Sequence, residues 1–178
     1  MYQVKYHLKS VSPYIQNNPE SKVDEIRDSS TPTRIGKQQD NFLKTGYKND
    51  LGYYIPFRQI KGMMFKAGMK VKLGRANIAQ FVRSSMFCDE HQIPMMNKGE
   101  VIKNYDFKYN DPVLKKDGKM VFSPRVAFNS WEIIFTLNIL MDSIPQAKVT
   151  EILVVGGYHF GLGSRRPDYG RFMVEEIV

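Results

Sequence analysis

A segment rich in glycine and arginine near the C-terminus holds residue types that bind phosphate. It spans residues 161–172 and reads GLGSRRPDYGRF. Glycines let a backbone come close to a ligand and turn its N–H groups toward an anion. Arginines add bidentate donors for phosphate oxygens, and a tyrosine ring can stack on a base. The segment therefore predicts nucleic-acid contacts at Gly161, Gly163, Ser164, Arg165, Arg166, Tyr169, Gly170 and Arg171.

This segment, called the glycine loop (residues 161–172) below, does not fit the common nucleotide-binding motifs. The Gly-Lys-Ser/Thr ending of a P-loop is absent. A dinucleotide fingerprint follows the first strand and opens a helix, whereas the glycine loop follows the last expected helix and leads into a strand. The alternative to a binding loop is a structural turn that docks its arginine and tyrosine side chains on neighbouring elements.

The stretch Leu51–Cys88 contains seven basic residues and no aspartate or glutamate. Much of this charge falls on one expected helix, opposite its apolar face. Charged helix faces usually mix signs, because acid–base pairs four residues apart stabilise the helix. A face of one sign attracts phosphates without reading bases, and the alternative is an ordinary solvated face. We predict nucleic-acid contacts at Arg58, Lys61, Lys66, Lys70, Lys72 and Arg75, and the seventh basic residue is Arg83.

Aromatic residues fall into two groups. Tyr105, Phe107 and Tyr109 alternate with lysines in the sequence KNYDFKY, which suits rings that stack between bases of a single strand. An edge strand or a hairpin with one apolar face would have the same pattern. The second group has strand periodicity and is expected in the core: Tyr2, Tyr6, Trp131 and Phe135.

Hydrophobic periodicity predicts the elements that would position these residues. Alternation with a period of two indicates strands at residues 2–8, 119–128, 130–140 and 171–177, with a tight turn at Asn129-Ser130. Pro56 fits the first turn of a helix, which we expect to run to about Lys72 and to end at Gly74.

Two further helices are expected. Residues 77–87 suggest a short one, and a last helix precedes the glycine loop. Asp142 or Ser143 is predicted to cap that last helix, with Pro145 in its first turn and Gly156-Gly157 near its end.

The main elements follow the order strand, helix, strand, strand, helix, strand. This βαββαβ order predicts an α+β, ferredoxin-like (RRM-like) fold, with an antiparallel sheet and helices on one face. We expect one domain, residues 1–178, with residues 16–50 as a long mobile insertion after the first strand, because that segment has few apolar residues.

Two segments resemble signatures of the RAMP superfamily, which supplies RNA-binding backbone and processing subunits of CRISPR effector complexes. The glycine loop, ending Gly170-Arg171-Phe172 before the last strand, resembles the superfamily's C-terminal signature. YIPFRQIKG (residues 54–62) resembles the entry "IPGSSLKG" into its first helix, with Phe57 in place of the usual glycine. The combination is similar to a group of small, uncharacterised bacteriophage proteins. The resemblance implies an RRM-like domain in which the glycine loop and Arg58 and Lys61 of the helix flank the nucleic acid.

RAMP-type nucleases often use a histidine for general acid–base catalysis, and the chain has His7, His91 and His159. His159 is the best placed, because it directly precedes the glycine loop. Neither a second histidine nor a lysine can be assigned to it as a partner, so no catalytic residue is predicted. A His-dependent or metal-dependent ribonuclease of the same fold remains an alternative.

Some RNA-cleaving RAMP subunits use an aspartate after the first strand, where this chain has Asp24, Asp28 and Asp40, with Glu25 nearby. Carboxylate oxygens suit Mg²⁺. The surrounding residues 16–50 hold six acidic and six basic residues, so a solvated loop is the favoured interpretation. Asp89-Glu90-His91 has metal-ligating residue types without a further ligand. We therefore predict no metal site and no cofactor.

Composition bounds the remaining possibilities. The chain has 178 residues, a net charge of +8 and a pI near 9.5. Its single cysteine, Cys88, excludes an intramolecular disulfide and a thiolate-rich zinc site, and is expected to be a buried thiol. No apolar run approaches the roughly 20 residues of a membrane helix. These features indicate a cytoplasmic protein without a membrane partner.

The sequence thus predicts non-catalytic binding of single-stranded nucleic acid, RNA or DNA, by a domain that assembles as a homo-oligomer along the strand. The uneven distribution of the net charge favours a nucleic-acid partner, since residues 16–50 contribute no net charge while residues 51–88 contribute seven positive charges. A phage structural or assembly protein, in which the basic helix is a subunit interface, is the other alternative.

Overall fold

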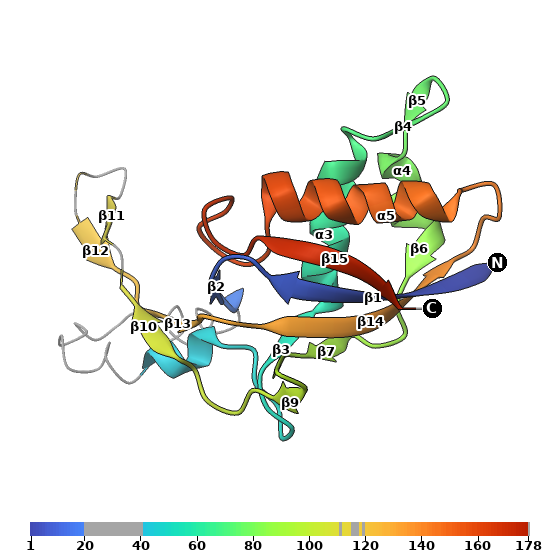
Figure 1. Ribbon diagram of the computed structural model, residues 1–178. Helices are drawn as coiled ribbons and strands as arrows, with labels where there is room; N and C mark the ends of the chain where they lie inside the picture. Colours follow the sequence, from blue (N-terminus) through green and yellow to red (C-terminus); the bar gives the residue numbers. More distant parts are fainter. Residues whose placement is uncertain (20–40, 111, 115–117, 119, 178) are drawn as a thin grey trace.

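A computed structural model describes residues 1–19, 41–110, 112–114, 118 and 120–177. Its main sheet has six antiparallel strands in the order β15-β1-β14-β8-β9, with β6 also paired to β14 (Figure 1). The strands are β1 (Tyr2–Ser10), β6 (Met86–Phe87), β8 (Met96–Asn97), β9 (Glu100–Val101), β14 (Glu132–Ile139) and β15 (Phe172–Ile177). The first, penultimate and last predicted strands are therefore neighbours in this sheet, with β15 at its edge.

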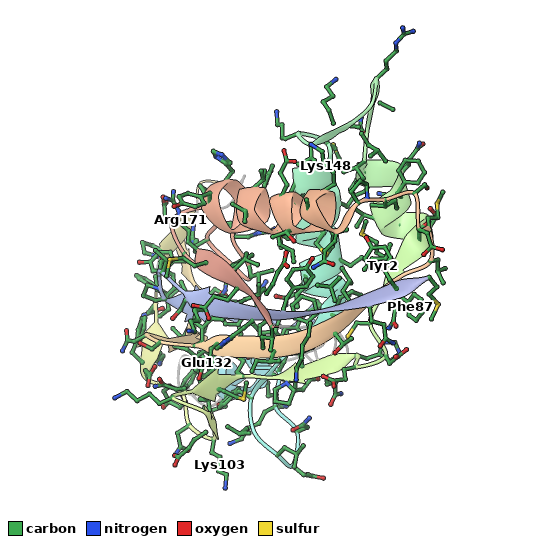
Figure 2. The ribbon with its side chains drawn as sticks, turned by 45° about the vertical axis from the view of Figure 1, so that its right-hand side comes forward. Tyr2, Phe87, Lys103, Glu132, Lys148 and Arg171 are labelled. Atoms are coloured by element: carbon green, nitrogen blue, oxygen red, sulfur yellow. The ribbon has the colours of Figure 1, made fainter. Side chains whose placement is uncertain are left out.

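Two helices, α3 (Phe57–Gly68) and α5 (Gln146–Val155), lie on the same side of the sheet (Figure 1). Figure 2 shows Lys148 of α5 and Lys103, which follows β9, on opposite sides of it. Tyr6 and Phe135 face each other across β1 and β14 and pack beneath these helices, both at most 1% exposed. The predicted core aromatics are confirmed for these two residues and for Trp131, which is 2% exposed.

Helix α3 begins at Phe57, so that Pro56 occupies its N-cap rather than its first turn, and it ends at Gly68 rather than near Lys72. A Cβ on Gly68 would stand 3.0 Å from the backbone of Ala79, the first residue of the next helix, α4 (Ala79–Ser85). Glycine at this position therefore lets α4 pack closely against the last turn of α3. The intervening residues form a two-stranded hairpin, β4 (Lys72–Leu73) and β5 (Ala76–Asn77).

The predicted N-cap of α5 is wrong, whereas Gly156 is its C-cap, in agreement with the glycine pair expected near its end. Pro145 occupies the N-cap itself, and no side chain caps the helix. The carboxylate of Asp142 instead pairs with the N-terminal ammonium of Met1. At its other end α5 continues into a π-helical turn, Gly156–Phe160, which the sequence analysis did not predict.

The predicted pairing of residues 119–128 with 130–140 is also wrong. This segment forms β12 (Met120–Phe122), paired with β11 (Pro112–Leu114), and β13 (Arg125–Phe128), paired with β10 (Phe107–Tyr109) and β2 (Tyr14–Ile15). Phe128 packs against the rings of Tyr14 and Tyr53, so its apolar surface is buried outside the main sheet. Tyr53 precedes β3 (Tyr54–Pro56), which pairs with β7 (Gln92–Pro94). The fold is thus α+β with several antiparallel sheets.

Both described ends of the predicted insertion 16–50 belong to the folded body. Gln16 is fully buried, donates to the carbonyl of Tyr54 at 2.9 Å and accepts from the N–H of Tyr47 at 2.6 Å. A 3₁₀ turn, Asn41–Thr45, precedes this contact. Residues 20–40 lie outside the described residues. No helix in the described part is long and apolar enough to span a membrane.

Candidate nucleic-acid interface

A cleft of about 540 Å³ separates helix α3 from the glycine loop. Its walls come from four segments of the chain: the end of β2, α3, the π-helical turn and the glycine loop. The lining residues are Asn17, Gln59, Lys66, His159, Phe160, Gly163, Ser164, Arg165, Arg166 and Pro167. The fold therefore brings together Lys66 of the predicted basic helix with Gly163, Ser164, Arg165 and Arg166 of the predicted loop.

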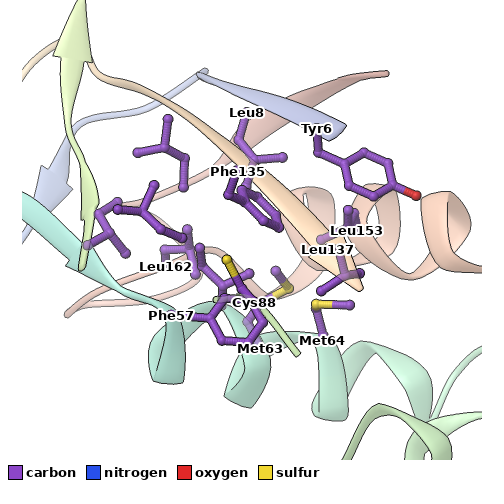
Figure 3. Packing of buried hydrophobic residues seen from close by; sticks show 14 of the residues in the cluster. Tyr6, Leu8, Phe57, Met63, Met64, Cys88, Phe135, Leu137, Leu153 and Leu162 are labelled. Carbon is purple, nitrogen blue, oxygen red and sulfur yellow. The ribbon is translucent and has the colours of Figure 1, made fainter. Parts of the chain in front are cut away.

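The first residues of the glycine loop are fixed to the body of the protein. Leu162 is fully buried, and Figure 3 shows it in the core beside Phe57 and Met63. The N–H of Ser164 donates to the carbonyl of Ile15 at 2.9 Å, which ties the loop to β2. These contacts hold the cleft wall in place before any ligand arrives.

The glycines of this loop serve the packing of the chain itself. Gly163 has a φ of 77°, and a Cβ there would overlap the Tyr14 ring and stand 2.5 Å from the carbonyl oxygen of Ile15. Gly170 has a φ of 76°, and its Cβ would overlap the carbonyl oxygen of Leu162. Gly161 and Gly170 are both buried. The structural alternative therefore explains these glycines, and approach to a ligand is not needed to account for them.

Cations dominate the cleft. Lys66 projects from the exposed face of α3, Arg166 is exposed, and Arg165 is half-buried. None of the lining residues is an aspartate or glutamate. Guanidinium and ammonium groups that converge without a carboxylate between them favour an anion, and the arginine fork suits phosphate in particular.

Gln59 is a lining residue that the sequence analysis missed, and a hydrogen bond from a buried tyrosine fixes the orientation of its side-chain amide. The Tyr14 hydroxyl donates to Gln59 Oε1 at 2.8 Å. Tyr14 is fully buried, and this burial raises the pKa of its hydroxyl far above the usual value, so the hydroxyl stays a neutral donor. Because the amide oxygen is engaged, the amide NH₂ of Gln59 remains as a donor for a ligand.

Other predicted loop residues do not line the cleft. Arg171 donates from Nε to the carbonyl of Pro167 at 2.8 Å, and its own N–H donates to Ser12 Oγ at 2.9 Å. Tyr169 packs edge-on against Tyr109, with ring centroids 5.4 Å apart. These two side chains stabilise the conformation of the loop. This part of the segment therefore fits the alternative of a structural turn whose arginine and tyrosine side chains dock on neighbouring residues.

The remaining basic residues of Leu51–Cys88 spread over a wider surface. The guanidinium of Arg58 lies over the Tyr47 ring, 5.7 Å from its centroid, and Arg83 lies over Phe65 at 3.8 Å. Lys61 is half-buried and does not line the cleft. The last three predicted residues, Lys70, Lys72 and Arg75, lie beyond the end of α3 and are exposed.

The three histidines lie in different surroundings. His159 lines the cleft from the π-helical turn. His7 lies on the sheet, with Nε2 2.8 Å from Glu132 Oε2, and His91 is exposed after α4 and β6. Tyr158, beside His159, is 66% exposed, and the sequence analysis did not consider it.

The metal candidates remain without support in the described part of the chain, where no group of three or more His, Cys, Asp or Glu side chains is arranged to hold an ion. Asp24, Glu25, Asp28 and Asp40 lie outside the described residues. Cys88 is buried, as predicted, and burial raises the pKa of its thiol.

The sequence matches no known protein-family model and no curated protein. The lining of the cleft suits an anion, since it offers several cationic and hydrogen-bond donor groups, and a half-buried ring, Phe160, lies in its wall.

Proposed function

We propose that this protein binds single-stranded nucleic acid without cleaving it, with backbone phosphates held in the cleft between α3 and the glycine loop. One observation carries the proposal: Lys66, Arg165 and Arg166 converge on one cleft from segments about a hundred residues apart. A charge that served only solubility would not need this convergence.

Aromatic rings at the cleft favour a single strand. Phe160 lies in the wall, and the ring of Tyr158 is exposed one residue before His159. Bases of a single strand can stack on such rings, whereas the bases of a duplex are already stacked on one another. The described strands β1, β14 and β15 direct no aromatic side chain to the face away from the helices, so the sheet face is not the expected stacking platform.

A ferredoxin-like ancestry of the RAMP type is part of this proposal. The longest strands lie in the order β15-β1-β14, with α3 after β1 and α5 after β14. That order corresponds to strands 4-1-3 of a βαββαβ domain, and the short strand β6 takes the place of strand 2 beside β14. The resemblance of the glycine loop to RAMP proteins agrees with this arrangement.

One observation favours a second candidate function, metal-independent RNA cleavage. His159 lines the cleft together with Lys66. An imidazole there could take the proton of a 2′-hydroxyl, whose oxygen then attacks the adjacent phosphorus, while the 5′-oxygen leaves and takes up a proton. Lys66 would stabilise the charge that develops on the phosphate.

A salt titration of binding tests the main proposal. The probes are fluorescent 12-nucleotide oligo(dT) and oligo(rU), measured by anisotropy. We expect binding that weakens with salt, and the double variant Lys66→Ala/Arg166→Ala should lose about tenfold in affinity, with a salt slope smaller by about 1.4. The control variant Lys5→Ala/Lys103→Ala removes the same charge from exposed positions outside the cleft.

Two outcomes decide against it. No binding of either probe at low salt overturns nucleic-acid binding altogether. An equal loss of affinity in the cleft variant and in the control variant would mean that binding is only non-specific charge attraction. Cleavage of labelled RNA that persists with chelator, and that His159→Ala abolishes while an all-deoxy strand stays intact, would establish the second candidate instead.

A further inference from the structure

The hairpin formed by β4 and β5 stands away from the sheet, beyond the C-terminal end of α3 (Figure 1). Its turn places Gly74, with a φ of 63°, beside Arg75. A Cβ on Gly74 would meet nothing within 4 Å, and all residues of the hairpin except Leu73 are exposed. The tip therefore makes no contribution to the packing of the core.

The base of this hairpin is nevertheless packed into the core. Val71 and Ile78, which flank it, are at most 1% exposed, and the N–H of Ile78 donates to the carbonyl of Val71 at 3.1 Å. Leu73 packs against the core cluster. The hairpin is thus a short projection on a fixed base, and its exposed side chains are held at a set distance from the cleft.

Three cations sit on or beside this projection. Lys70, Lys72 and Arg75 are exposed, and within the described residues none of their three side chains makes a hydrogen bond or an ion pair. Lys70 lies four residues after Lys66, which lines the cleft, and just beyond the end of α3. The cations therefore continue from the cleft along the end of α3 to the hairpin tip.

We propose that the β4–β5 hairpin is a second phosphate anchor, so that one single strand is held both in the cleft and at the hairpin. This inference rests on the proposed function, since it concerns the path of the same strand. Between Lys66 and Arg75 the chain spans at most about 26 Å, two residues of helix plus seven extended residues, which equals about eight stacked nucleotides.

A strand must therefore exceed a certain length before it engages the hairpin. Oligonucleotides of about four nucleotides fill the cleft alone, whereas strands of about ten or more span both anchors. Because the second contact then forms within an existing complex, its contribution should appear as a step in affinity with length rather than as a constant factor.

The experiment compares wild type with Lys72→Ala/Arg75→Ala on oligo(dT) and oligo(rU) of 4, 6, 8, 12 and 16 nucleotides, with the shortest strands measured by competition. Gly74 is kept so that the turn can form. We expect equal affinities for 4 nucleotides and a loss of about fivefold to tenfold from 12 nucleotides upward. The charge-reversing Lys72→Glu/Arg75→Glu should enlarge the long-strand loss, and circular dichroism checks that each variant is folded.

The outcomes separate this inference from the proposed function. If wild type binds no strand, the proposed function fails. If wild type binds and Lys66→Ala/Arg166→Ala weakens binding, while the hairpin variants match wild type at every length, the second anchor is overturned and the cleft stands. If the hairpin variants lose the same factor in affinity for 4 and for 16 nucleotides, the second anchor is also overturned, because general charge attraction then explains the loss.

Discussion

Gly62 lies in the middle of the exposed face of α3, one turn after Arg58 and one turn before Lys66. A Cβ at this position would meet nothing within 4 Å. Gly68, by contrast, is required by the contact with Ala79. Since a glycine inside a helix destabilises it by about 0.5–1 kcal/mol relative to alanine, packing does not explain Gly62. Close approach of a ligand to this turn of helix would explain it.

Replacing this glycine separates stability from binding. Gly62→Ala should raise the free energy of unfolding by about 0.5–1 kcal/mol, measured by urea denaturation, because alanine favours the helix. If a strand approaches this turn, the same variant should bind oligo(dT) more weakly than wild type, because the new methyl group would stand between the strand and the helix. An affinity equal to that of wild type would show that no ligand approaches this turn.

A second residue-level prediction concerns Glu132 on the sheet. Its Oε1 accepts the N–H of Gly99 at 2.8 Å, and its Oε2 lies 2.8 Å from Nε2 of His7. The Gly99 N–H, and secondarily His7, lower the pKa of the Glu132 carboxyl below its usual 4.5. The carboxylate therefore adds stability that is present above the unfolded-state pKa and is lost as the pH falls through the lower folded-state value.

Glu132→Gln keeps an acceptor for Gly99 and cannot titrate. Urea unfolding between pH 5 and pH 3 should show wild type losing more stability than the variant, with the two curves converging at the acid end. Parallel curves over the whole range would mean that Glu132 contributes no pH-dependent stability.

At the scale of elements, glycine contacts determine how the cleft wall is built. The α5 helix turns into the π-helical segment where a Cβ on Gly156 would overlap the Met63 sulfur, and one on Gly157 would overlap the carbonyl oxygen of Phe172. Glycine thus lets α5 approach both α3 and β15 just before the cleft. π-Helical turns inside α-helices are often found at functional sites, and this one presents His159 to the cleft.

The same turn leaves Tyr158 exposed next in sequence to the cleft residue His159, which leads to a prediction about stacking. Tyr158→Ala should weaken binding of a 12-nucleotide single strand by about fivefold or more, because one stacked base contributes about 1–3 kcal/mol. The slope of affinity against salt should not change, since no phosphate contact is lost. Phe122→Ala is the matched control, because Phe122 is also exposed (55%) and lies on β12. A change in slope would indicate that Tyr158 does not act by stacking.

Local patterns allowed some elements to be predicted and left others undetermined. The alternation of Val4, Tyr6 and Leu8 identified β1, and the apolar face of α3 identified that helix, because both signals lie within a few neighbouring residues. The pairing of β13 with β10 and β2 depends on partners far away in the sequence, which no local period encodes.

The candidate site was predictable to a similar extent. The charges of Lys66, Arg165 and Arg166 could be read from composition. The amides Asn17 and Gln59 could not, because they join the cleft only through the hydroxyl of Tyr14 and the folding of β2 beside the glycine loop.

At the scale of the whole molecule, the cleft exists only in the folded chain, because its walls come from residues between Asn17 and Pro167. A ligand of the cleft must therefore stabilise the fold as a whole. At 100 times its dissociation constant, a strand should add about 2.7 kcal/mol, which for a chain of this size raises Tm by about 5–10 °C. We expect this shift with 12-nucleotide oligo(dT) in low salt, measured by differential scanning calorimetry.

High salt should remove the shift, because counterion release weakens with salt and the net charge of +8 is screened. Lys66→Ala/Arg166→Ala, which binds about tenfold more weakly, should keep only about half of the shift at the same strand concentration, since its stabilisation falls to about 1.4 kcal/mol, whereas Lys5→Ala/Lys103→Ala should keep all of it. An undiminished shift in the cleft variant would place the strand on another surface. A shift of equal size with inorganic phosphate alone would mean that the cleft takes a small anion, because one phosphate cannot reach both the cleft and the rings beside it.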